Sequence, residues 1–151
     1  MIYITQEQND LLYVCSLIEF VGRITQNTNA DVVRALRKEG LARQIRLADI
    51  NHCLSFEEVG DEIIEEYKIQ QGSFNLIDTC KYDIPSYVDI GGVYRDLILD
   101  VKDEQGGEVV DIMFAVFTSF ISEKISNFNS SLYYENPSYI YHSYVAGELL
   151  D

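Results

Sequence analysis

The chain has 151 residues, of which 47% are hydrophobic and 12% aromatic, and its formal net charge is −14. This composition is typical of a globular domain with its own core and excludes an intrinsically disordered chain. The negative charge repels phosphate groups and therefore disfavours binding to nucleic acid or to anionic lipid through bulk electrostatics.

Cysteine usage and the absence of targeting patterns indicate the compartment. Cys15, Cys53 and Cys80 lie far apart and form no CxxC pair, so we expect reduced thiols and neither a disulfide framework nor a metal site. No signal-peptide pattern and no apolar run of about 18 residues is present. The sequence therefore predicts a cytoplasmic protein of one domain, residues 1–151, with no membrane segment.

The first predicted helix is the most hydrophobic. Thr5 and Gln8 have the spacing of a capping box, and the apolar pattern that follows predicts a helix from about Glu7 to Arg23. Its side chains are apolar nearly all round, which is typical of a helix in the centre of a bundle.

Two short helices with basic side chains are expected next. The first begins at Thr28 or Asn29 and ends at Gly40, and the second spans Leu41 to about Ile50. Two helices joined by a tight turn are typical of some DNA-reading proteins. The net charge instead favours a basic face that pairs with the protein's own acids or with a partner protein. This basic band consists of Arg34, Arg37, Lys38, Arg43 and Arg46.

The clearest amphipathic helix runs from Phe56 to about Tyr67, with Ser55 and Glu58 spaced as another capping box. Carboxylates fill the side opposite its apolar stripe. They are Glu57, Glu58, Asp61, Glu62, Glu65 and Glu66. A solvated helix face is the simplest interpretation, and a partner-binding surface centred on Glu58, Glu62 and Glu65 is the functional one.

Residues 71–88 show no sustained period and are predicted to connect a helical half at about 1–70 to another at about 89–151. A short strand in this connector is an alternative. A fifth helix is expected from Asp89 to about Val101, with Gly91 and Gly92 in its N-terminal turn because glycine is unfavourable in a helix interior.

After the turn at Gln105, a sixth helix is expected from Val109 to about Ile125, antiparallel to the fifth. Asn136 and Pro137 supply a cap and a favoured first residue for the last helix. The predicted fold is therefore all-α, a compact bundle of about six to seven helices in two packed halves.

Aromatic residues gather near the C-terminus: Phe128, Tyr133, Tyr134, Tyr139, Tyr141 and Tyr144. Tyrosine offers a large contact area with a polar tip and is enriched at protein interfaces. Tyrosines can equally cap the core of a small bundle with their hydroxyls in water. In the first case Tyr133, Tyr134, Tyr141 and Tyr144 are the contact residues.

No constellation of residues predicts catalysis. His52 and His142 are far apart and are interpreted as loop or surface histidines. Motifs for phosphate, nucleotide or zinc binding and for a nucleophile elbow are missing. We therefore expect no catalytic, cofactor-binding or metal-binding residues.

The stretch IEFVGRITQNTNADVVRALRKEGLARQIRLADINHCLSFEEVGDEIIEEYKIQQGSFN, from Ile18 to Asn75, resembles a family of small bacterial helical proteins of unknown function. Members of that family are often encoded beside proteins that resemble ADP-ribosyltransferases, as in toxin and antitoxin pairs. The segment from Asp89 looks like a second helical module that accompanies such proteins. What the resemblance implies is a partner-binding role, with no catalytic residue carried over.

Three functional hypotheses follow. The first is a non-enzymatic, antitoxin-like or accessory protein that binds and controls a toxin-like enzyme, such as one resembling an ADP-ribosyltransferase. The second is a nucleic-acid-binding transcriptional regulator that uses the basic band, and the third is an enzyme with an unrecognised site. Self-association of two copies through the tyrosines is an alternative to a different partner protein.

Overall fold

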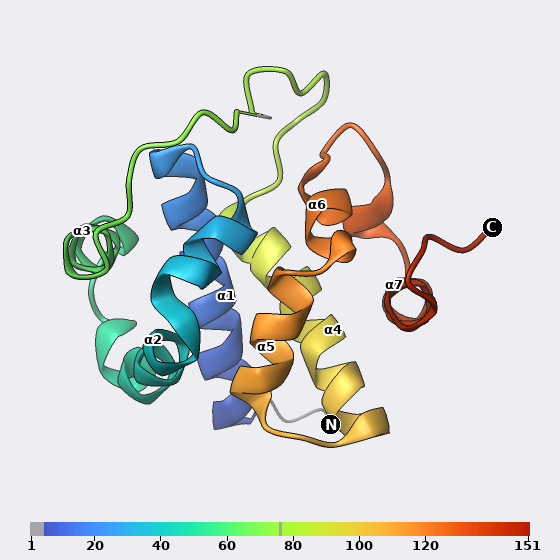
Figure 1. Ribbon diagram of the computed structural model, residues 1–151, viewed down its shortest axis with the longest axis horizontal. Coiled ribbons are helices and arrows are strands. Elements are labelled where there is room, and N and C mark those ends of the chain that lie inside the picture. Colours follow the sequence, from blue (N-terminus) through green and yellow to red (C-terminus); the bar gives the residue numbers. More distant parts are fainter. Residues whose placement is uncertain (1–4, 76) are drawn as a thin grey trace.

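The computed structural model describes residues 5–75 and 77–151, and these residues form a compact helical bundle without strands (Figure 1). The all-α fold class is thus confirmed, although several helix boundaries differ from the expected ones. The helices are α1 (Gln6–Thr25), α2 (Asn29–Asn51), α3 (Phe56–Glu66), α4 (Tyr87–Gln105), α5 (Val109–Phe117), α6 (Phe120–Ser126) and α7 (Pro137–Ala146), with a 3-10 turn η1 (Leu132–Tyr134) before α7.

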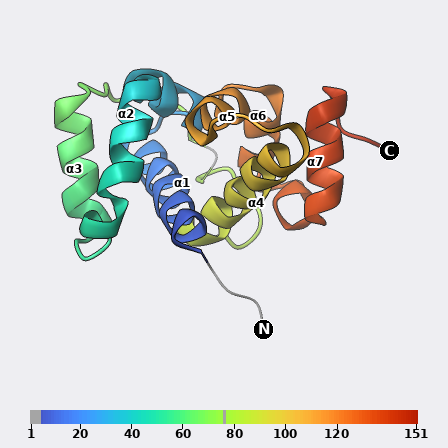
Figure 2. The same cartoon turned by 90° about the horizontal axis from the view of Figure 1, so that it is seen from below.

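Helix α1 lies at the centre of the bundle, as its apolar pattern predicts. It packs along α4 on one side and against α2 and α3 on the other. The two helices α1 and α4 are antiparallel, because Glu7 at the start of α1 pairs with Lys102 at the end of α4. Helix α5 closes the bundle over α2 and α4, while α3 and α7 lie at opposite ends (Figure 2).

Four predicted helix starts are confirmed at the level of their hydrogen bonds. Thr5 and Gln8 form the complete capping box of α1, and the hydroxyl of Thr28 accepts from the backbone N–H of Asp31 at 3.1 Å. Ser55 caps α3 in the same way, although only the Ser55 half of the predicted capping box with Glu58 is formed, and Asn136 caps α7 with Pro137 in its first turn. These caps satisfy N–H groups that have no partner within the helix.

The expected break between two helical segments is present, but it lies at Arg37 and not at Gly40. Arg37 has φ of 63° and ψ of 175°, which are not helical, so two helical segments of α2 meet there at a kink and the second continues through Gly40. Gly40 is instead a packing position, since a Cβ there would lie 3.0 Å from the ring of Tyr67. The kink turns the second part of α2 while both parts still face the core.

The kink leads to a prediction about stability. A positive φ combined with an extended ψ strains any residue that carries a Cβ, so Arg37→Gly should raise the free energy of unfolding by about 1 kcal/mol. Urea unfolding followed by circular dichroism measures this change. Arg46 is equally exposed but helical, so Arg46→Gly should lower stability by about 1 kcal/mol. A loss in both variants would show that Arg37 is not strained.

Helix α4 begins earlier than expected. Ser86 and Asp89 form a capping box that starts the helix at Tyr87, so Gly91 and Gly92 lie in its second turn and not in an N-terminal turn. Gly91 is required by packing, because a Cβ there would overlap the hydroxyl of Ser16 and lie 2.8 Å from its backbone nitrogen. At this point α1 and α4 approach each other at backbone distance.

The expected sixth helix is divided into α5 and α6. The break falls at Thr118 and Ser119, whose hydroxyls bond back to the carbonyls of Phe114 at 2.6 Å and Val116 at 2.7 Å. The Ser119 hydroxyl also accepts from the N–H of Ile121 and so caps α6. Hydroxyl groups that bond to nearby backbone in this way compete with helix continuation.

The connector between α3 and α4 contains no strand in its described residues. Two of its backbone N–H groups nevertheless bond to the end of α1, from Gly72 to the carbonyl of Thr25 and from Phe74 to that of Gln26, each at 2.8 Å.

None of the helices in the described part of the chain combines the length and apolar character that crossing a membrane requires.

Candidate partner-binding surfaces

Helix α3 presents one buried and one exposed side. Val59 and Ile63 face the core, and Gly60 lets α3 approach α1 closely, since a Cβ there would lie 2.9 Å from the ring of Phe20. The opposite side is called the α3 acidic face. It consists of Glu57, Glu58, Asp61, Glu62, Glu65 and Glu66, all of them exposed.

The charge of the α3 acidic face is largely uncompensated. Within residues 5–75 and 77–151, only Glu66 of the six has an ion-pair partner, Arg43 at 3.0 Å. The negative field extends to α1: burial raises the pKa of the Tyr13 hydroxyl, and the charge of Glu62 raises it further. The structure thus places Glu58, Glu62 and Glu65 together on one accessible surface.

Two exposed apolar side chains lie in the segment that leads into α3. Ile50 at the end of α2 is 68% exposed and Leu54 in the turn before α3 is 42% exposed. Exposed apolar residues beside a charged stripe are a common composition for a surface that binds another protein.

The tyrosines predicted as contact residues do not form one exposed surface. Tyr134 is 69% exposed, whereas Tyr133, Tyr141 and Tyr144 are partly buried against the core. The ring of Tyr133 packs edge-on against Phe128 at 5.8 Å, and burial raises the pKa of the Tyr144 hydroxyl. Most of this group therefore covers the core, as in the second interpretation of the aromatic pattern.

Tyr133 also lines a cleft of about 330 Å³ between the first half of α4, η1 and the start of α7, with Leu12 of α1 as a further lining residue. We call it the α4–α7 cleft. Sequence reasoning missed it, because its walls come from segments about forty residues apart in the chain and no local pattern predicts their meeting.

Most of the basic band is paired within the protein. Arg34 bonds to Asp31 at 3.2 Å, Lys38 to Asp111 at 3.1 Å and Arg43 to Glu66 at 3.0 Å. Arg37 and Arg46 are exposed. A nucleic-acid-binding face needs cations free to contact phosphates, so these ion pairs favour the interpretation that the band serves the protein's own acids.

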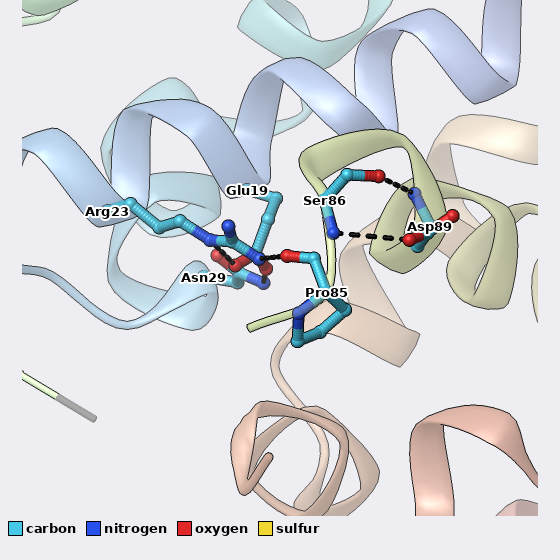
Figure 3. A network of polar contacts seen from close by, with 6 residues as sticks. All are labelled: Glu19, Arg23, Asn29, Pro85, Ser86 and Asp89. Carbon is cyan, nitrogen blue, oxygen red and sulfur yellow. Dashed lines mark hydrogen bonds and ion pairs between the residues drawn. The ribbon is translucent and has the colours of Figure 1, made fainter. Parts of the chain in front are cut away.

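Among the described residues, a buried polar cluster of Glu19, Arg23 and Asn29 most resembles a catalytic arrangement (Figure 3). Glu19, only 4% exposed, accepts from Arg23 at 2.7 Å and from Asn29 at 2.8 Å. Arg23 also donates to the carbonyl of Pro85 at 2.8 Å and lies over the ring of Tyr87. A carboxylate and an arginine four residues apart within an otherwise apolar helix are the signal by which the sequence could have revealed this cluster.

This cluster has a structural role. Both carboxylate oxygens of Glu19 are occupied, and the adjoining cavity of about 30 Å³ is too small for a substrate. Arg23 joins α1 to the segment that precedes α4, so the cluster fixes the connector to the bundle.

The two histidines do not come together with each other in the structure. His52 caps the end of α2 and His142 lies on α7, at opposite ends of the bundle (Figure 2). Burial raises the pKa of the Cys15 thiol, which keeps it protonated. Among the described residues, no three His, Cys, Asp or Glu side chains are grouped to hold a metal ion.

No family model, curated protein or solved structure matches the chain. The functional proposal therefore depends on the surfaces described above.

Proposed function

We propose that the protein is a non-enzymatic, cytoplasmic interaction protein that binds and controls a toxin-like enzyme with a basic surface. The observation that carries this proposal is the α3 acidic face, where five exposed carboxylates have no ion-pair partner among the described residues. Enzymes that act on nucleotides or nucleic acids present basic clefts, and complementary charge accelerates encounter and fixes the register of a complex.

Charge reversal on the α3 acidic face should abolish the complex. The tagged chain and its variant Glu58→Lys, Glu62→Lys, Glu65→Lys are purified from the native host at low and moderate salt, and co-eluting proteins are quantified by mass spectrometry. We expect one stoichiometric partner with a basic surface, such as an ADP-ribosyltransferase-like protein, and at least about a tenfold lower recovery with the variant.

The matched control changes the net charge equally at the end of α4 and the start of α5, with Asp103→Lys, Glu104→Lys and Glu108→Lys, all exposed positions. Its partner recovery should remain close to that of the unchanged chain. Equal losses in both variants would contradict a specific role for α3. Recovery of the protein without a different partner protein would contradict control of an enzyme. Light scattering would then show whether the protein is a monomer or binds only a second copy of itself.

A further inference from the structure

The α4–α7 cleft has an apolar floor and an open mouth. Leu97 and Ile140 form the floor and are buried, whereas Val88 at the mouth is 48% exposed. Leu12, Val93, Tyr133 and Pro137 complete the apolar lining. In Figure 1, α7 stands beside α4 at the end of the bundle, away from α3. The cleft is therefore a separate surface from the α3 acidic face.

Gly92, which lines this cleft, is not required to be glycine by the packing of the described residues. A Cβ at Gly92 would meet only the Arg95 Nη2 atom, at an ordinary 3.9 Å. Its neighbour Gly91 differs, because it contacts α1 at backbone distance. Glycine destabilises a helix interior relative to alanine. The missing side chain at Gly92 leaves room for an occupant that approaches the helix backbone.

The cleft carries a net negative charge. Its charged lining residues are Asp89, Asp96, Glu135 and Arg95. Arg95 pairs with Asp96 at 3.0 Å, whereas Asp89 and Glu135 have only neutral hydrogen-bond donors among the described residues, the N–H of Ser86 and the hydroxyl of Ser131. Two carboxylates without a cationic partner among the described residues thus line the cleft beside its apolar residues.

We propose that the α4–α7 cleft binds a segment of a partner protein in which one large apolar side chain is flanked by lysine or arginine. The apolar side chain lies on Leu97 and Ile140 beside Gly92, and the flanking cations face Asp89 and Glu135. The inference rests on the proposed function, since the occupant is a partner protein, and it adds a second contact surface with its own sequence preference.

The test uses nuclear magnetic resonance of the full chain labelled with nitrogen-15. The probe is a synthetic peptide with a central phenylalanine between lysines. In one matched peptide serine replaces the phenylalanine, and in the other glutamates replace the lysines. We expect saturable shifts of the amide signals of Gly92 and Val93, and at least about tenfold weaker binding of either matched peptide.

Two variants show whether the cleft is responsible. Gly92→Leu should fill the cleft and weaken binding of the lysine–phenylalanine peptide about tenfold or more, while thermal unfolding occurs at the same or a higher temperature. Glu135→Lys, at an exposed position outside the core, should weaken binding by reversing the rim charge, and it serves if Gly92→Leu does not fold.

Several outcomes would overturn the inference. One is a peptide that shifts only amides of α3, such as Gly60, and another is binding unchanged by both variants. If the amide signal of Gly92 shifts with protein concentration in the absence of peptide, the cleft binds a second copy of the chain instead. None of these outcomes affects co-purification through the α3 acidic face, so failure here and failure of the proposed function are distinguishable.

Discussion

Gly91→Ala is expected to lower the free energy of unfolding by about 3 kcal/mol, at the upper end for an added methyl group in a packed interior. The new Cβ would overlap the Ser16 hydroxyl and lie 2.8 Å from the Ser16 nitrogen and 3.0 Å from its Cα. Backbone atoms within a helix cannot rotate away as a flexible side chain does, so α1 and α4 must separate along a contact that spans much of both helices.

Urea unfolding followed by circular dichroism measures this loss, and the adjacent glycine supplies the control. Gly92→Ala places the same methyl group one residue along the same helix, where it would meet only the Arg95 Nη2 atom at an ordinary 3.9 Å. It should raise the free energy of unfolding by up to about 1 kcal/mol because alanine favours helix. A similar change in both variants would contradict the close approach of α1 to α4.

Arg23→Met is expected to lower the free energy of unfolding by roughly 3–5 kcal/mol, the usual cost of removing one partner from a buried ion pair. Glu19 would remain buried with Asn29 as its single described donor, and the carbonyl of Pro85 would lose its bond from α1. Chemical denaturation gives the free energy, and faster proteolysis within residues 70–86 should accompany it, since the connector would lose its tie to the bundle.

The matched control is Arg34→Met, which removes a cation from an exposed ion pair with Asp31 and should cost under about 1 kcal/mol. Combining Glu19→Gln with Arg23→Met should recover part of the lost stability, because no uncompensated charge then stays buried. Equal effects of Arg23→Met and Arg34→Met would show that the Glu19 cluster does not hold the connector.

Helix caps and amphipathic stripes were predictable because both are local. Thr28, Ser55 and Asn136 act within three residues of the groups they cap, and the apolar stripe of α3 follows from its period alone. The kink at Arg37 has no such signature, since arginine rarely adopts a positive φ. The sequence pattern does not predict the break at Ser119, because the apolar period continues from α5 into α6.

The candidate surfaces likewise differ in how far local sequence patterns predict them. The α3 acidic face lies on one helix, and its period predicts its exposure. The α4–α7 cleft and the bond from Arg23 to Pro85 join segments that are distant in the chain, so they depend on packing that a single sequence does not encode locally. The tyrosines are predicted only in part. Their composition indicates that an apolar ring will be covered while the hydroxyl stays near water, but it does not show which rings face the core.

The pairing of α1 with α4 also determines when the protein folds as it is made. Helix α1 leaves the ribosome before α4, and although α2 and α3 can cover one of its sides, the side that packs on α4 has no partner until the chain has been extended to Gln105 at the end of α4. During that interval a strongly hydrophobic helix is exposed on a nascent chain. A transcript interrupted within the connector would therefore yield an aggregation-prone fragment, and a folding chaperone has its natural target in the apolar side of α1.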